Sequence, residues 1–203
     1  MLATTLKSLS FENAARLARE GAAFVDLRPT GDYLEVHIPG SLHLLYEFGP
    51  GMASRARDCL PLDVPLMLIE EQGVDMKNAA SALRGKGFTV LGSVPDAVGR
   101  WAEAEGTPAS TEVIERGSGL ELEMIDVGDP GANPPQGSRK ISIERLWTLA
   151  GELSGQESVA IATGYGVRAS LAVGMLERAG VREVLFVKTR AVPRTTPKLE
   201  PYG

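Results

Sequence analysis

The stretch that decides the fold reads Val159-Ala-Ile-Ala-Thr163-Gly-Tyr-Gly-Val-Arg168-Ala-Ser170. It begins with a short apolar run, which is typical of a buried strand. A small, glycine-rich turn follows at Gly164 to Gly166. Apolar residues then recur at helical spacing, and they are Leu171, Ala172, Met175, Leu176 and Ala179. The stretch therefore predicts a strand, a tight loop and the N-terminus of a helix.

A loop of this kind can bind a small anion. Several backbone N–H groups turn toward one point, and the helix dipole adds partial positive charge there. Arg168 lies on the rim of the loop. The predicted anion-binding residues, called the second loop below, are Thr163, Gly164, Tyr165, Gly166, Val167 and Arg168. The predicted ligand is a small anion such as sulfate, thiosulfate or phosphate.

The same stretch resembles the active-site loop of the rhodanese family of sulfurtransferases, in which C-x-x-G-x-R follows a strand. Gly166 and Arg168 stand at the glycine and arginine positions, whereas Thr163 stands at the cysteine position. Sulfur transfer by this loop type needs a thiolate that attacks a sulfur donor and holds a persulfide. An alcohol has a far higher pKa than a thiol, so Thr163 cannot take over that role.

A second resemblance to the family lies near the N-terminus. Rhodanese domains carry D-x-R after a strand and then a segment of the form E-Y…G-H-I-P-G-A. The matching residues here are Asp26, Arg28, Tyr33, His37, Ile38, Pro39 and Gly40, and the departures are Asp32, Val36 and Ser41. We interpret Asp26 and Arg28 as ion-paired charges at a strand end, and His37 as a hydrogen-bonding residue rather than a base.

The strand, loop and helix pattern occurs twice. Leu66–Ile69 predicts another strand, and the residues 70–75 that follow it are called the first loop below. Equivalent residues of the two patterns are 93 positions apart, as residues 70 and 163 are. The equivalent pairs are Glu70 and Thr163, Gly73 and Gly166, Asp75 and Arg168, Leu83 and Leu176, and Gly87 and Gly180. Such self-similarity indicates a repeat. The resemblance covers roughly residues 5–102 and 120–188.

The predicted fold is α/β, with two tandem rhodanese-like domains, each a parallel sheet with helices on both faces. We place the first domain at residues 1–105 and the second at 106–203, with a proline-containing C-terminal tail. A helix is predicted over 11–20 with Ser10 as its N-cap. Residues 48–63 are expected to be irregular because they hold several glycines and prolines. Residues 111–125 are expected to include a hairpin around Gly117-Ser-Gly119.

Composition narrows the classes of function. The 203 residues carry a net charge of −5 with both signs interspersed, which argues against a nucleic-acid-binding surface. No apolar run is long enough for a membrane span, and Met1–Lys7 lacks the features of a signal peptide. One cysteine, Cys59, excludes an intrachain disulfide and favours a cytoplasmic location. With two histidines it also makes a structural metal site improbable, and no cofactor is predicted.

The first loop carries acidic residues where an anion would bind, namely Glu70, Glu71 and Asp75. With Glu70 and Thr163 at the two cysteine positions, the predicted function is that of a catalytically degenerate rhodanese-like protein. It would bind a small anion or a partner protein in sulfur metabolism, for example as a subunit of an active sulfur-handling enzyme. The enzymatic alternative is a thiosulfate or persulfide sulfurtransferase that uses Cys59 or a partner's cysteine. A phosphatase related to the dual-specificity enzymes would also need the missing loop cysteine.

Overall fold

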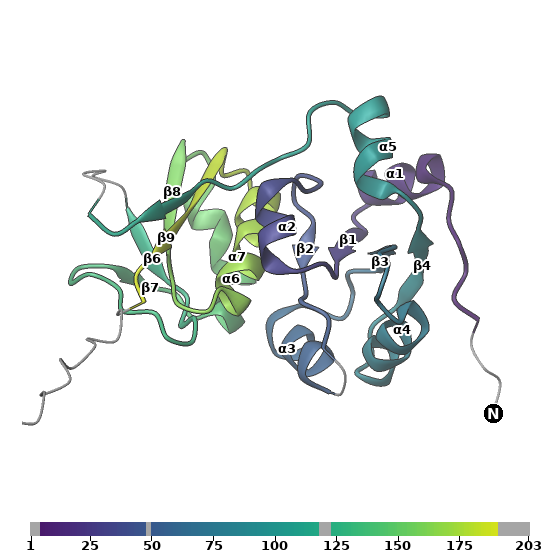
Figure 1. The fold of residues 1–203 in the computed structure, drawn as a ribbon, viewed down its shortest axis with the longest axis horizontal. Coiled ribbons are helices and arrows are strands. Elements are labelled where there is room, and N and C mark those ends of the chain that lie inside the picture. The colour runs from purple at the N-terminus through teal and green to yellow at the C-terminus, as the bar shows by residue number, and fades with distance from the viewer. Residues whose placement is uncertain (1–4, 48–49, 118–122, 191–203) are drawn as a thin grey trace, which may run out of the picture.

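Two parallel β-sheets stand side by side with helices between them (Figure 1). The computed structural model describes residues 5–47, 50–117 and 123–190. The sequence segments from 23 to 94 supply one sheet, and those from 113 to 188 supply the other. The predicted α/β class, with parallel sheets flanked by helices, is confirmed.

The first sheet has the strand order β2-β1-β3-β4, and every pairing is parallel. Its strands are β1 (Ala23–Asp26), β2 (Leu42–His43), β3 (Leu66–Ile69) and β4 (Val90–Val94). The helices described in this half are α1 (Phe11–Arg19), α2 (Thr30–Glu35), α3 (Gly51–Cys59), α4 (Met76–Gly85) and α5 (Ala97–Ala104). Ser8 forms an isolated parallel bridge to Ser93, so the chain before α1 lies beside β4.

The second sheet has the order β5-β9-β8-β6-β7, again with every pairing parallel. Its strands are β5 (Val113–Glu115), β6 (Met124–Asp126), β7 (Arg139–Lys140), β8 (Ser158–Thr163) and β9 (Glu183–Lys188). The helices described in this half are α6 (Ile143–Leu149), the 3-10 helix η1 (Ala150–Leu153) and α7 (Val167–Arg178).

The strand ladders follow the spacing of the sequence repeat. Ile69 pairs with Val94 in the first sheet, and Ala162 pairs with Val187 in the second. Each residue of the second pair lies 93 positions after its counterpart, as the two loops do. The bridge from Ser8 to β4 matches the place of β5 beside β9. The two sheets therefore share one strand order. The domain limits at residue 105 stay a prediction.

Helices cover both faces of the first sheet, because its strands are apolar on both sides. Phe24 and Met67 pack with α1 and α5, whereas Val25 and Leu68 pack with α3 and α4. The helices described in the second half all pack on the face of their sheet that carries Val159 and Ile161. The opposite face buries a small separate cluster, composed of Ala160, Leu185 and Val187 with Ile114 and Met124 against it. Among the described residues, no helix contributes to that cluster.

Two local expectations are confirmed by the helices. The predicted helix over 11–20 is α1, and the Ser10 side chain accepts a hydrogen bond from Asn13 N at 3.3 Å. Asp75 caps α4 in the same way, with Asn78 N at 2.9 Å. None of the described helices is long and apolar enough to cross a lipid bilayer.

The expectation that residues 48–63 are irregular is wrong. Helix α3 occupies residues 51–59 and buries four side chains on one face, which are Met52, Ala53, Ala56 and Cys59. These residues recur at helical spacing, but the glycines and prolines around the segment outweighed that pattern in the sequence. Pro50 immediately precedes the first turn, where a proline is tolerated.

The hairpin expected within residues 111–125 is also wrong. Strand β5 pairs in parallel with β9, and β6 pairs in parallel with β7 and β8. Two strands therefore lie between β5 and β6 in the sheet. The alternating pattern of these segments indicated strands correctly, but local sequence does not specify the partner of a strand in a parallel sheet. Residues 118–122 and the C-terminal tail from 191 lie outside the described residues.

The two halves meet where α7 lies against β2 and α2 (Figure 1). A Cβ atom on Gly174 would lie 2.0 Å from the carbonyl oxygen of Ser41, so only glycine allows this approach. The Glu177 carboxylate lies 3.0 Å from His37 Nε2 and accepts a hydrogen bond from Gly40 N at 2.7 Å. A partly buried polar contact therefore joins the motif near residue 37 to the helix that follows the second loop.

Candidate functional site

The second loop begins where β8 ends. Thr163 is 1% exposed, and its hydroxyl donates a hydrogen bond to the carbonyl oxygen of Val187 at 3.0 Å. Gly166 has φ +86°, a conformation that favours glycine, and α7 begins at the next residue. The loop thus has the strand, turn and helix geometry that the sequence predicted, and its threonine hydroxyl is bonded to the neighbouring strand.

The backbone donors of the second loop bind a carboxylate from the same chain. Asp129 Oδ2 accepts from Gly164 N at 2.8 Å and from Gly166 N at 2.7 Å. Its Oδ1 accepts from Arg168 N at 2.8 Å and from Ala169 N at 3.2 Å. Asp129 is 4% exposed. The loop therefore holds an anionic group, and that group is supplied by the chain itself.

Sequence reasoning did not find Asp129. The residue lies in the connection from β6 to β7, and β6 is the neighbour of β8 in the sheet. The carboxyl ends of adjacent parallel strands meet at one edge, so this adjacency was the signal that could have revealed the contact. Gly164 fits closely against the same connection, since a Cβ there would lie 2.1 Å from the carbonyl oxygen of Pro130.

The side chain of Arg168 points away from the cradle formed by the loop amides. Its Nη1 donates to the carbonyl oxygen of Gly128 at 3.1 Å, and its Nη2 lies 3.8 Å from Glu144 Oε1. Tyr165 is 60% exposed at the tip of the loop. The guanidinium carbon of Arg190 lies over the Tyr165 ring, 4.2 Å from the ring centroid. Of the predicted site residues, the amides thus converge on one point while the two largest side chains diverge.

The acidic side chains of the first loop have structural partners. Glu70 Oε1 accepts a hydrogen bond from Ser93 Oγ at 2.6 Å, and Asp75 caps α4. Gly73 keeps the glycine conformation of the loop, with φ +83°. Within the described residues, no group of three or more His, Cys, Asp and Glu side chains could hold a metal ion.

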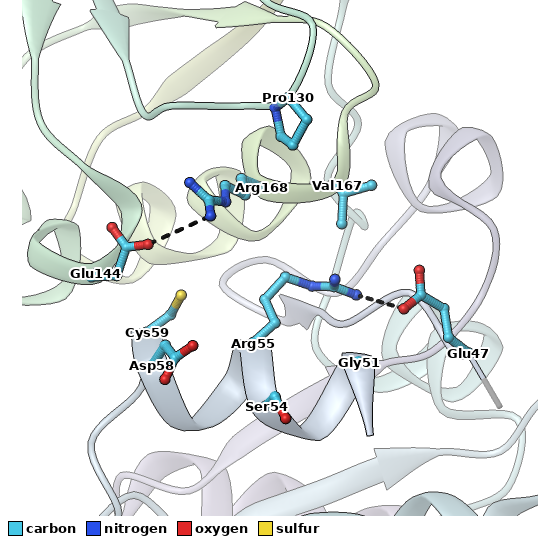
Figure 2. Close-up of a pocket in the computed structure, with 10 residues that line it drawn as sticks. All are labelled: Glu47, Gly51, Ser54, Arg55, Asp58, Cys59, Pro130, Glu144, Val167 and Arg168. Carbon is cyan, nitrogen blue, oxygen red and sulfur yellow. Dashed lines mark ion pairs between the residues drawn. The ribbon is translucent and has the colours of Figure 1, made fainter. Parts of the chain in front are cut away.

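A cavity of about 410 Å³ lies between α3 and the start of α7 (Figure 2). Its lining brings Cys59 and Arg55 from α3 together with Arg168 from the second loop (Figure 2). Acidic side chains balance the two arginines: Arg55 lies 3.8 Å from Glu47, and Glu144 faces Arg168. The cavity also contains Gly51, Ser54, Asp58, Pro130 and Val167. Cys59 and the predicted loop therefore share one cavity, which the sequence did not indicate.

Burial raises the pKa of the Cys59 thiol to about 11, and the nearby carboxylates of Glu144 and Asp58 add to the effect. The side chain is 5% exposed. Because the thiolate is the nucleophilic form of cysteine, such a thiol reacts slowly near neutral pH.

Comparisons with known proteins find relatives for the first half of the chain. A model of the rhodanese-like domain matches residues 11–103. The thiosulfate sulfurtransferase GlpE of Pseudomonas savastanoi pv. phaseolicola is 32% identical over 98 residues, which cover 48% of this chain and 89% of that protein. GlpE of Pseudomonas syringae pv. syringae is 33% identical over 98 residues, with the same coverage. The chain belongs to the rhodanese-like family.

Among solved structures, a thiosulfate sulfurtransferase from Pseudomonas aeruginosa aligns with 92% of this chain at 15% sequence identity, with a TM-score of 0.41. The chain spans 43% of that protein's length. A third relative, GlpE of Pseudomonas entomophila, is 33% identical over 95 residues and is covered to 84%.

The rhodanese-like motif residues of the first half have structural roles, as the sequence predicted. Arg28 Nη2 lies 2.7 Å from Asp26 Oδ2 in a partly buried ion pair and donates to the carbonyl oxygen of Val36. His37 Nδ1 lies 2.8 Å from the carbonyl oxygen of Tyr33, and its Nε2 faces Glu177. Both ring nitrogens of His37 thus face oxygen atoms, one of a backbone carbonyl and one of a carboxylate.

Proposed function

We propose that this rhodanese-like protein consists of two rhodanese-like domains in tandem and acts by binding rather than by sulfur transfer. The observation that carries the proposal is the occupation of the second loop by Asp129. A sulfurtransferase loop needs those amides for its thiolate and persulfide, and here they are committed to a carboxylate.

The tandem arrangement is supported by equivalent contacts in the two halves. Asp26 Oδ1 accepts a hydrogen bond from Arg28 N at 3.0 Å, and Asp126 Oδ1 accepts one from Gly128 N at 2.9 Å. The shared strand order and the constant spacing of the ladders support the same proposal. We take Glu70 and Thr163 to stand at the two family cysteine positions.

Two ligand classes follow from the sequence, a small anion and a partner protein in sulfur metabolism. The occupied amides favour the partner protein, because a small anion would have to displace Asp129 first. The exposed Tyr165 and its contact with Arg190 give the loop tip an aromatic and cationic surface, which is common at protein contacts. A cytoplasmic location stays a prediction.

The alternative is a sulfurtransferase that uses Cys59. The observation in its favour is the cavity that Cys59 shares with Arg168, since an arginine could bind an anionic sulfur donor there. The raised pKa of Cys59 argues against it, because little thiolate forms near neutral pH.

A thiosulfate–cyanide assay separates the two proposals. The wild type and Cys59→Ser would be measured beside an active GlpE-type sulfurtransferase, with thiocyanate formation as the readout. We expect both forms of this protein to remain at the background rate. Turnover in the wild type that is lost in Cys59→Ser would replace the binding proposal by the enzymatic one. Turnover that survives in Cys59→Ser would contradict both.

A further inference from the structure

The carboxylate of Asp129 has the environment of a bound oxyanion. Each of its two oxygens accepts two backbone hydrogen bonds, at 2.7 to 3.2 Å. In the part of the chain that the structure describes, no lysine, arginine or histidine forms an ion pair with it. Arg168, the cationic residue of the second loop, donates its backbone N–H to Asp129 and its guanidinium N–H to the carbonyl oxygen of Gly128. The charge is therefore stabilised by amide dipoles and the helix N-terminus.

The segment that carries Asp129 is fastened over the loop at several points. Tyr165 N donates to the carbonyl oxygen of Pro130 at 2.8 Å. Asn133 N donates to Thr189 Oγ1 at 3.0 Å, and that hydroxyl donates to the carbonyl oxygen of Thr163 at 2.9 Å. The missing side chain of Gly164 leaves room for this close packing. Asp129 is thus presented to the amides by a segment built to lie there.

The first half has other residues at the positions that correspond to Gly128 and Asp129. Counting from Asp26 and Asp126, Arg28 corresponds to Gly128, and Pro29 corresponds to Asp129. In the first half the arginine pairs with Asp26. In the second half Gly128 adopts φ +71°, and the residue after it turns its carboxylate into the loop. The two halves therefore differ at two adjacent positions, and the half with Gly128 and Asp129 is the one whose loop amides bind a carboxylate.

We propose that Asp129 is an internal competitor of external anions: its carboxylate keeps the second loop closed to carboxylates and oxyanions, and its removal opens a binding site for them. The proposal rests on the proposed function only in treating the second loop as an anion cradle. The group that the site would accept is a small carboxylate or tetrahedral oxyanion whose oxygens replace Oδ1 and Oδ2. Asp129 is then the residue that decides whether the loop is a ligand site.

The test is chemical rescue of Asp129→Ala. This variant leaves the amides unpaired and a space of carboxylate size, so its melting temperature should fall by several degrees. Sodium formate or sulfate at 10–100 mM, on the order of weak-site concentrations, should restore at least half of that loss. Sodium chloride of equal ionic strength should not. In calorimetric titration the variant should bind formate or sulfate at least tenfold more tightly than the wild type.

Asp126→Ala is the matched control, because it removes a nearby aspartate, the last residue of β6, whose Oδ1 accepts a hydrogen bond from the Gly128 amide and not from the loop amides described above. It should show no rescue. Asp129→Asn keeps the side-chain volume without the charge, and it should be destabilised but not rescued. If Asp129→Ala does not fold in chloride, refolding in formate should recover it.

The proposal is overturned if Asp129→Ala gains no anion binding, if the wild type binds formate or sulfate equally well, or if neither salt permits refolding. Each of these results leaves the thiocyanate assay unaffected, so the failure of this proposal is distinct from the failure of the proposed function.

Discussion

Helix α7 approaches β2 so closely that Gly174→Ala should separate the two halves measurably. The new Cβ would lie 2.0 Å from the carbonyl oxygen of Ser41 and 3.3 Å from Tyr33 Oη. The Cβ is fixed rigidly to the helix backbone and the Ser41 oxygen belongs to the backbone immediately before β2, so relief requires one element to shift by about 1.5 Å to reach an ordinary contact distance. Such a shift would also strain the hydrogen bonds that Glu177 makes to His37 and Gly40.

The magnitude follows from two opposing effects. Overpacking costs about 1–3 kcal/mol, and the backbone obstacle places this site near the upper end. Alanine is favoured over glycine within a helix by about 1 kcal/mol. The net loss of unfolding free energy is therefore about 2 kcal/mol. For a chain of this size, that loss lowers the melting temperature by roughly 4–8 °C.

Thermal unfolding followed by fluorescence suits the question, because Trp101 lies in α5 and Trp147 in α6, one in each half. Trp→Phe variants at each position would report the halves separately. Gly85→Ala is the matched control: Gly85 is the last residue of α4, and a Cβ there meets nothing within 4 Å. That control should gain about 0.5–1 kcal/mol. If Gly174→Ala is as stable as the wild type, the close packing of α7 on β2 is wrong.

Three further predictions concern reactivity and pH. Cys59 should react with iodoacetamide at least roughly a hundredfold more slowly than free cysteine at pH 8, and its rate should rise tenfold per pH unit up to about pH 11; a plateau below pH 9.5 would contradict the raised pKa. Thr163→Cys in a Cys59→Ser background should stay unreactive, because the site is buried and Asp129 occupies the loop amides. Adding Asp129→Ala should speed alkylation of this cysteine at pH 7 at least about tenfold. Equal alkylation rates in the two variants would argue against Asp129 as a competitor of external anions. Burial lowers the pKa of His43, whose Nδ1 lies 2.7 Å from Ser170 Oγ, so the folded protein favours the neutral imidazole. The free energy of unfolding should therefore fall as the pH drops below about 6.5, and His43→Gln should flatten that decline in urea melts at pH 5–7.

Local pattern was sufficient for much of the fold. The apolar runs at 66–69 and 158–163 are strands, and a helix follows the strand and turn in each half, as the repeated pattern predicted. The repeat spacing also survives in the strand ladders. These features depend on side chains a few residues apart and on burial of both faces of a strand, which the sequence encodes directly.

Helix α3 and the pairing of β5 show where local pattern fails. In α3 the turn-forming residues nearby masked a short apolar face. For β5, an alternating pattern indicated a strand, but its partner β9 comes from the far end of the chain. Parallel strands need long crossover connections, so the partner of a strand lies far away in sequence, where local pattern does not identify it.

The sequence by itself determined the strand, loop and helix of the second loop, its glycines, and the threonine at its first position. Only the tertiary structure decided what the loop binds. The parallel pairing of β6 with β8 brings the connection after β6 to the same edge as the loop, and Asp129 is delivered to the amides. The same assembly brings Cys59 into the cavity of Arg168. Neither contact leaves a trace in local sequence, because each joins residues that only the packed sheets bring within hydrogen-bonding or van der Waals distance.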